Sequence, residues 1–214
     1  MMHELKHIVN AFNKAKDLNL KAVLASVVDL DGSSYRKPGV RMLILENDEM
    51  IGAVSGGCVE KEVLRQAQSV FLDGKSKIMT YDGRYRLGCE GVIYILLEEF
   101  NPVDDYIEKF KVALNNRVSI EIQSFYYRKE GIFPDIGSIA DIDDQQFSLS
   151  GLKESDESLN KFRQELSPCF KLVILGAEHD AVQLCQLAAA TGWEVEVVSG
   201  VSEPKTIENF PGAQ

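Results

Sequence analysis

The amino-acid sequence predicts an α+β N-terminal domain followed by a partial α/β unit of the βαβ type. Through residues 1–100, short strand-like runs occur together with amphipathic helical patterns. Further along the chain, a buried-type strand pattern at 171–175, a helical pattern at 180–190 and a second strand pattern at 194–198 follow one another. The 45% hydrophobic content of the 214 residues is sufficient for a packed core.

The predicted N-terminal domain, residues 1–100, begins with an amphipathic helix over residues 3–17. Apolar residues recur there at helical spacing: Leu5, Ile8, Val9, Phe12 and Ala15. Strands are expected at 22–28, 41–45, 50–55, 77–81 and 92–98, and a helix is expected to start near Cys58, directly after a pair of glycines. Together these elements form an α+β domain of common size.

The remainder of the chain is predicted to contain an additional α/β segment with a linker, residues 101–170, and a truncated Rossmann-like domain, residues 171–214. A helix at 103–114, a strand at 118–127 and a hairpin-like tail are expected first. The polar, acidic stretches 141–146 and 153–161 indicate a loop and a solvated connecting helix. Only 16 residues follow Val198, too few for a complete doubly wound sheet.

Charge and composition exclude several classes of protein. With 33 acidic against 23 basic side chains, the chain has a net charge of -10, so we expect no nucleic-acid partner. The longest apolar run, residues 92–97, is too short to span a membrane, and residues 1–10 lack the apolar region of a signal peptide. These observations predict a cytoplasmic protein whose cysteines are mainly reduced.

The first candidate site is the loop at residues 32–39, together with Arg41 just after it. The loop places hydroxyls and cations between glycines, which permit close backbone approach. A loop of this kind can bind a phosphate or an oxygen-rich heterocycle through charge-assisted hydrogen bonds. The predicted ligand contacts are Ser33, Ser34, Tyr35, Arg36, Lys37 and Arg41. An ordinary polar connection between strands is the alternative.

The second candidate site is the segment 55–60, where a strand, two glycines and a helix follow one another. Backbone N–H groups at a helix start favour an anion, and they also favour the thiolate form of a cysteine placed there. The predicted contacts are Ser55, Gly56, Gly57, Cys58 and Glu60. A similar turn before a strand contains Gly88 and Cys89. The alternative is that these cysteines are small buried hydrophobes, as we expect for Cys169 and Cys185.

The segment 172–180 starts as a dinucleotide-binding fold does, with a strand, a glycine and a helix. However, Glu178 stands where a glycine would admit a pyrophosphate, and Ser199 stands where an acidic residue would hold the ribose. We therefore expect that NAD does not bind. The sequence His3–Glu4–Leu5–Lys6–His7 matches a zinc motif, but both histidines fall on the polar face of the predicted helix, so we expect no zinc there.

Taken together, these motifs resemble the XdhC/CoxI family, the accessory proteins of molybdenum hydroxylases such as xanthine dehydrogenase. The resemblance rests on GSSYRKPGVRM at 32–42, SGGCVE at 55–60 and GCEG at 88–91, with the βαβ pattern at 171–199 resembling the start of a C-terminal Rossmann domain. It covers residues 1–100 and 171–199.

The resemblance implies a chaperone that binds the molybdenum cofactor (molybdopterin) transiently and assists its sulfuration by a cysteine desulfurase. It further implies delivery of the cofactor to a xanthine dehydrogenase-type molybdenum hydroxylase. Cys58 and Cys89 are then the reactive residues, and Cys58 is a candidate ligand of the molybdenum. An accessory factor is favoured over a true oxidoreductase. An NAD(P)-dependent oxidoreductase and a non-catalytic assembly or scaffold module are the alternatives, and a homodimer is possible.

Overall fold

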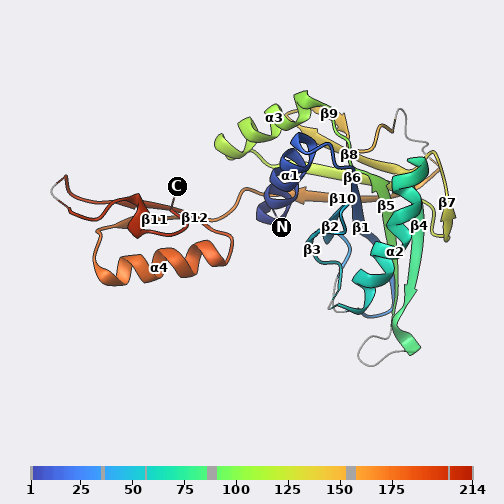
Figure 1. Cartoon of the computed structure of the whole chain (residues 1–214), viewed down its shortest axis with the longest axis horizontal. Coiled ribbons are helices and arrows are strands. Elements are labelled where there is room, and N and C mark those ends of the chain that lie inside the picture. Colours follow the sequence, from blue (N-terminus) through green and yellow to red (C-terminus); the bar gives the residue numbers. More distant parts are fainter. Residues whose placement is uncertain are drawn as a thin grey trace. The chain divides into compact units, whose positions relative to one another are not determined.

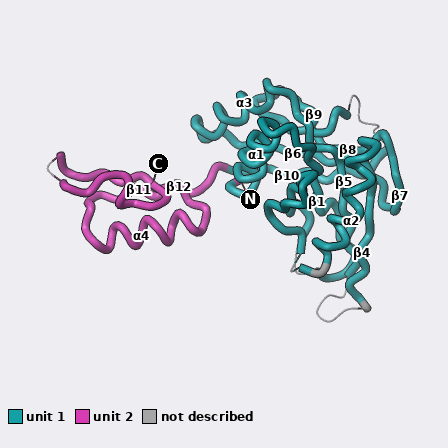
Figure 2. Tube along the Cα trace, viewed as in Figure 1, with its two compact units in different colours: residues 1, 3–167 teal, residues 2, 168–214 magenta. Residues whose placement is uncertain are grey.

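The computed structural model describes residues 2–34, 37–55, 57–85, 91–152, 158–201 and 203–213. The chain divides into two compact units, residues 3–167 and 168–214 (Figure 2). The boundary predicted at residue 100 lies inside the first unit. No helix among the described residues is both long and apolar enough to cross a membrane.

Sheet A is the central layer of the first unit, and each of its strands runs antiparallel to its neighbours (Figure 1). Within the described residues it has six strands, in the order β3 (Met50–Gly52), β2 (Arg41–Leu45), β1 (Ala22–Asp31), β5 (Val92–Glu99), β4 (Lys77–Asp82) and β7 (Gly131–Ile132). A 3-10 turn, η1 (Gly83–Tyr85), follows β4. β3 ends at Gly52, earlier than the expected residue 55, and β1 extends to Asp31.

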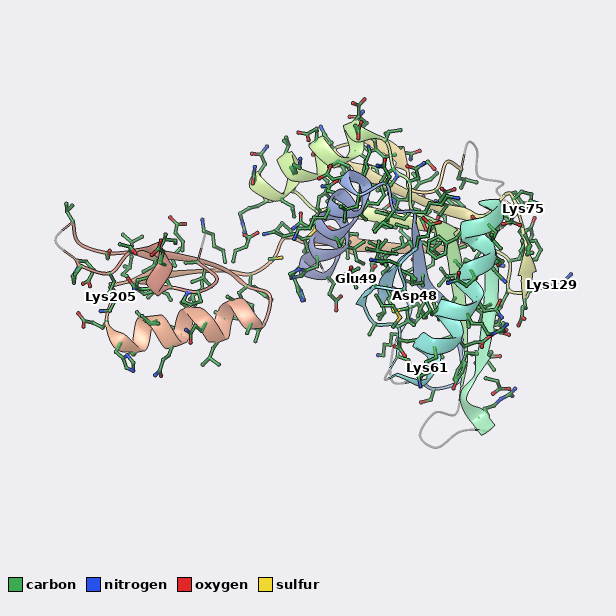
Figure 3. The ribbon with its side chains drawn as sticks, viewed as in Figure 1. Asp48, Glu49, Lys61, Lys75, Lys129 and Lys205 are labelled. Carbon is green, nitrogen blue, oxygen red and sulfur yellow. The ribbon has the colours of Figure 1, made fainter. Side chains whose placement is uncertain are left out.

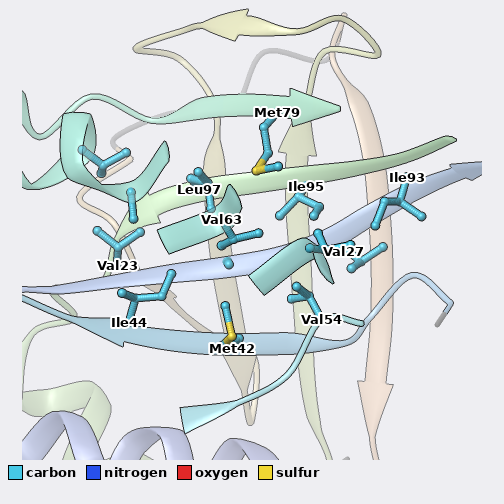
Figure 4. Close-up of a cluster of buried hydrophobic side chains, with 14 of the residues drawn as sticks. Val23, Val27, Met42, Ile44, Val54, Val63, Met79, Ile93, Ile95 and Leu97 are labelled. Atoms are coloured by element: carbon cyan, nitrogen blue, oxygen red, sulfur yellow. The ribbon is translucent and has the colours of Figure 1, made fainter. Parts of the chain in front are cut away.

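Helix α2 (Cys58–Asp73) covers one face of sheet A. Its apolar side chains, among them Val63, pack against alternate residues of the strands, including Val23 and Ile95, and form a buried cluster (Figure 4). Every second side chain of a strand lies on this face, and these side chains pack against the apolar face of α2. This core fixes the strands to which the candidate loops are connected.

Sheet B packs on the other face of sheet A. Within the described residues it has four strands, in the order β10 (Asn160–Leu166), β6 (Ile120–Tyr126), β8 (Gly137–Ile142) and β9 (Gln145–Ser148). Val28 and Leu96 of sheet A lie in one buried cluster with Phe125 of sheet B. Helices α1 (Met2–Asp17) and α3 (Asp104–Asn115) complete the unit, with the Phe12 ring of α1 stacked edge-on against Phe100 at 4.9 Å.

Strand β10 differs from the expectation for its region. The sequence predicts a solvated helix over 153–161, but residues 160 and 161 begin a strand, and residues 153–157 lie outside the described residues. β10 is an edge strand, in which Arg163 and Glu165 are exposed between partly or fully buried neighbours and Lys161 is exposed as well. Charged side chains are common on edge strands, and here they conceal the apolar alternation on which a strand prediction depends.

The second unit contains the expected βαβ arrangement. Strands β11 (Lys171–Leu175) and β12 (Glu194–Val198) are parallel, and α4 (His179–Ala190) connects them. The small core of this unit includes Ile174, Cys185, Val195 and Phe210, the last of these next to the short turn η2 (Ile207–Asn209). The mixed α/β class is therefore correct for both units.

Candidate functional site

The candidate segments leave sheet A at one end. Asp31 at the end of β1 pairs with Val92 at the start of β5, and Val92 pairs in turn with Asp82 at the end of β4. At the same end, β2 begins at Arg41, and β3 ends at Gly52 before the chain enters α2. The described residues that flank the three candidate segments, at 31–34, 52–55 and 82–85 with Gly91, therefore lie at the same end of sheet A (Figure 1).

Two of these segments touch through their backbones. A Cβ atom at Gly91 would lie 2.6 Å from the carbonyl oxygen of Ser33 and 2.8 Å from that of Asp31, so only a glycine fits without displacement. The N–H of Gly83 donates to the carbonyl of Gly91 at 2.9 Å and closes the segment between β4 and β5. The glycine that ends the GCEG motif thus lies against the start of the loop 32–40.

The described residues of the loop 32–40 range from exposed to buried. Ser33 and Lys37 are exposed, and Ser34 is half-buried. The loop returns to the sheet where Gly39 donates its N–H to the carbonyl of Val27 at 2.8 Å. The predicted contacts Tyr35 and Arg36 lie outside the described residues, as do Gly56, Gly88 and Cys89.

Helix α2 begins with a cap formed by its own chain. The buried carboxylate of Glu60 accepts hydrogen bonds from the N–H of Ser55 at 2.7 Å, the hydroxyl of Ser55 at 2.9 Å and the N–H of Gly57 at 2.8 Å. Gly57 adopts a left-handed conformation, with φ of 115°, which favours glycine. Cys58 is the first residue of the helix, and its side chain lies outside the described part.

This cap changes the interpretation of the second candidate site. Burial alone would raise the pKa of Glu60, but hydrogen bonds from Ser55 and Gly57 outweigh it and hold the pKa below its usual value. The carboxylate thus occupies donors that the sequence analysis assigned to a ligand. In the structure, Ser55, Gly57 and Glu60 hydrogen-bond to one another at the helix start.

Arg41 is buried between the end of the loop 32–40 and strand β10. Its side chain is 7% exposed, and its Nη1 donates to the carbonyl of Gly39 at 3.1 Å and to Oε1 of Gln164 on β10. Burial lowers the pKa of Arg41 to about 10, against the opposing effect of the Glu98 charge. In the structure this side chain joins β2 to sheet B, and its contact with a ligand stays a prediction.

Asp29 and Arg128 are not among the residues predicted from the sequence. Nε of Arg128 lies 3.0 Å from Oδ2 of Asp29, near the end of β1 and next to the loop 32–40. Asp29 is close to the loop in sequence, whereas Arg128 follows β6 of the other sheet and no short motif contains it. The run of charged residues 128–130 directly after a predicted strand was the signal available.

In the second unit, the loop between β11 and α4 ends at Glu178, the residue that precedes the first turn of α4. The N–H of Gly176 donates to the carbonyl of Val198 at 2.8 Å. Cys185 is fully buried, its thiol lies 3.7 Å from the carbonyl oxygen of Pro211, and burial raises its pKa. Cys185 therefore packs as a small hydrophobe, as expected.

The two histidines of the zinc-like motif lie one turn apart on α1. The ring centroids of His3 and His7 are separated by 6.1 Å. No cluster of three or more histidine, cysteine, aspartate or glutamate side chains suited to a metal ion occurs within the described ranges.

The fold and the gathered loops define the class: an α/β protein with glycine-rich segments at one end of an antiparallel sheet. Within that class, residues 17–82 match the model of the XdhC and CoxI family. The resemblance to this family is confirmed. The match includes the loop 32–40 and the start of α2.

Curated relatives extend the similarity along the chain. A probable xanthine dehydrogenase subunit of Bacillus subtilis (strain 168) is 32% identical, over 90% of this chain and 64% of the relative. The molybdenum cofactor insertion chaperone PaoD of Escherichia coli (strain K12) is 28% identical, over 82% of this chain and 52% of the relative. The chain therefore spans less than two thirds of either relative.

A solved structure has the same fold. The crystal structure of a xanthine dehydrogenase from Bacillus halodurans superposes with a TM-score of 0.75 at 24% sequence identity, covering 96% of this chain and 66% of that one. The mixed α/β architecture of the two units is thus found in an experimental structure.

Proposed function

We propose that this chain is an accessory chaperone that binds the molybdenum cofactor transiently and supports its insertion into a xanthine dehydrogenase-type molybdenum hydroxylase. The observation that carries the proposal is the backbone contact between Gly91 and the loop at Ser33, which brings separate sequence motifs to one end of sheet A. The family match and the relative named as a molybdenum cofactor insertion chaperone support the same function.

The residues at this end of the sheet fit a phosphorylated pterin better on the loop side than on the helix side. Ser33 and Lys37 are exposed and offer a hydroxyl and a cation to a phosphate. At the helix start, Glu60 already occupies the N–H of Gly57. We therefore place the anionic part of the cofactor at Ser33, Ser34, Tyr35, Arg36 and Lys37.

The bound cofactor supplies the molybdenum centre, and the protein supplies anion contacts and thiols. A thiolate is a soft ligand suited to a transition metal, so Cys58 at the start of α2 is the proposed metal contact. Gly88 and Cys89 belong to the neighbouring segment, and Cys89 is the second proposed reactive thiol. Sulfuration would draw on a cysteine desulfurase as a partner.

For the second unit we propose a Rossmann-like βαβ element that does not bind NAD. Glu178 precedes the first turn of α4 and places a carboxylate where a dinucleotide needs space and neutral or positive charge. An NAD(P)-dependent oxidoreductase is the weaker alternative for this reason. A cytoplasmic location and a homodimer complete the proposal.

The proposed function is tested by purifying the chain from a molybdate-replete host and from a host unable to make the cofactor. Acid denaturation and oxidation convert released pterin to a fluorescent product that can be quantified per chain. We expect pterin only in the first preparation, together with activation of an apo-hydroxylase on mixing. Equal fluorescence in both preparations would support a scaffold module instead.

A further inference from the structure

The segment that connects β6 of sheet B to β7 of sheet A runs across the strands that carry the candidate loops. We call residues 126–130 the crossing segment. In sheet A, Asp29 of β1, Tyr94 of β5 and Thr80 of β4 pair in one register row. The crossing segment contacts each residue of that row.

Alternate residues of the crossing segment make these contacts. The hydroxyl of Tyr126 hydrogen-bonds to Asp29, and burial, followed by the Asp29 carboxylate, raises the pKa of Tyr126 to about 12, so the phenol stays a donor. The guanidinium of Arg128 lies 3.0 Å from Asp29 through Nε and 5.6 Å from the centre of the Tyr94 ring. Between the contact residues, Lys129 is exposed and extends from the ribbon beside β7 (Figure 3).

Glu130 contacts the third residue of the row, because its Oε2 accepts a hydrogen bond from the hydroxyl of Thr80 at 2.5 Å. The crossing segment is thus attached in turn to β1, β5 and β4. These are the strands whose ends, at Asp31, Val92 and Asp82, lead into the loop 32–40 and the segment 83–91.

A β-bulge explains why Asp29 is available to sheet B. The register between β1 and β5 shifts between Val27 and Asp29, so Val28 has no partner of its own on β5. Val27 faces α2, and strict alternation would turn Asp29 to that same apolar face. The extra residue instead lets both Val28 and Asp29 face sheet B, and bulges commonly redirect a side chain in this way.

The charges show what Arg128 does. Its Nη2 also lies 3.7 Å from Oδ1 of Asp31, so one guanidinium faces two carboxylates and the group is net negative. Such a group does not recruit an anion. We propose that Arg128 is a positioning residue: by holding Asp29 and Asp31 it fixes the end of β1, and with it the contact between the loop at Ser33 and Gly91. This inference rests on the proposed function, because the loop matters as a cofactor site.

The test compares Arg128→Ala with Arg163→Ala in the full chain. Arg163 forms a comparable surface ion pair with Glu121 within sheet B, so its removal changes the net charge equally. Measurements are the pterin content after purification from the molybdate-replete host, the melting temperature, and hydrogen–deuterium exchange of peptides covering residues 32–40. The exchange measurement needs no cofactor.

We expect Arg128→Ala to lower the pterin content about three- to fivefold, in line with the loss of one partly exposed ion pair. Hydrogen–deuterium exchange in residues 32–40 should become faster in Arg128→Ala. Arg128→Lys should restore most of the pterin content. Arg163→Ala should change neither the pterin content nor the exchange. If Arg128→Ala does not fold, Asp29→Asn gives the same comparison, since its amide oxygen still accepts the Tyr126 hydrogen bond.

Unchanged exchange in folded Arg128→Ala, or equal losses in Arg128→Ala and Arg163→Ala, would overturn the positioning role. Absence of pterin from the unmodified chain would instead refute the proposed function. In that case exchange at residues 32–40 alone decides whether Arg128 positions the loop.

Discussion

Gly91 and Ser33 lie so close that a Cβ atom on residue 91 would come within 2.6 Å of the Ser33 carbonyl oxygen and 2.9 Å of its nitrogen. Both neighbours are backbone atoms, so a side chain at position 91 can be accommodated only by moving the loop. This contact joins the loop 32–40 to the GCEG motif at 88–91, at the end of sheet A.

Replacing Gly91 by alanine should therefore separate these segments. We expect Gly91→Ala to lower the free energy of unfolding by about 1–3 kcal/mol, the usual effect of overpacking, and to reduce the pterin content. Urea unfolding and pterin fluorescence measure the two effects. Gly200→Ala is the control, because a Cβ atom there meets nothing within 4 Å. Equal stability of the two variants would show that the loop yields freely.

The cap on α2 predicts a pH-dependent contribution to stability. Because the pKa of Glu60 is lowered in the folded state, its stabilising effect is present above the unfolded pKa and is lost as pH falls through the folded value. Glu60→Gln should lower the free energy of unfolding by about 1–2 kcal/mol at pH 7. The difference from the unmodified chain should shrink below about pH 4, near the ordinary glutamate pKa.

Urea unfolding of Glu60→Gln at pH 7 and in the acid range measures this difference. Glu108→Gln on α3 is the matched variant, since Glu108 is exposed and pairs with Lys111 across the helix surface at 2.8 Å. Its effect should stay below about 0.5 kcal/mol. A Glu60→Gln effect that is independent of pH would contradict an ionised cap.

Glu98 should show the opposite pH dependence. It is fully buried on β5 and accepts hydrogen bonds from the N–H of Ser138 at 2.7 Å and from its hydroxyl at 2.6 Å. Burial raises its pKa despite these bonds. Its contribution to stability is thus largest below the unfolded pKa and declines as pH rises through the folded value.

Glu98→Gln keeps the shape and removes the ionisation. Relative to this variant, the unmodified chain should lose stability as pH is raised from the acid range toward 8. Glu98→Ala should lower the free energy of unfolding by about 1–3 kcal/mol, because it leaves the Ser138 N–H without an acceptor. Identical pH profiles for the unmodified chain and Glu98→Gln would show that Glu98 ionises normally inside the fold.

The second unit should bind neither NAD nor FAD appreciably. The reason is the Glu178 carboxylate before α4, supported by Ser199 in the place of an acidic residue after β12. Isothermal titration of the purified chain with each dinucleotide should give no saturable heat. A micromolar or tighter dissociation constant would restore the oxidoreductase alternative.

The regular elements were predictable where apolar periodicity is strong, as in α1, α2 and the strands β1, β2 and β5. The glycine motifs also indicated where the candidate site lies. Strand β10 was not predictable, because its exposed side chains are charged, and the burial of Arg41 was not predictable, because its partner Gln164 is distant in sequence. The cap by Glu60 was within reach of sequence reasoning, since a glutamate three residues after the N-cap residue, here Gly57, is a known capping position.

The central claim, that the glycine-rich end of sheet A holds the cofactor, is tested most directly by the pterin content of Cys58→Ser beside that of Cys185→Ser. Cys58→Ser should retain the fold, with a stability change of about 1 kcal/mol. Its pterin content should fall about tenfold or more, because a metal ligand matters at least as much as its outer-shell partners. Cys185→Ser, altered in the core of the second unit, should lose stability and keep its pterin. Full pterin content in folded Cys58→Ser would contradict the account.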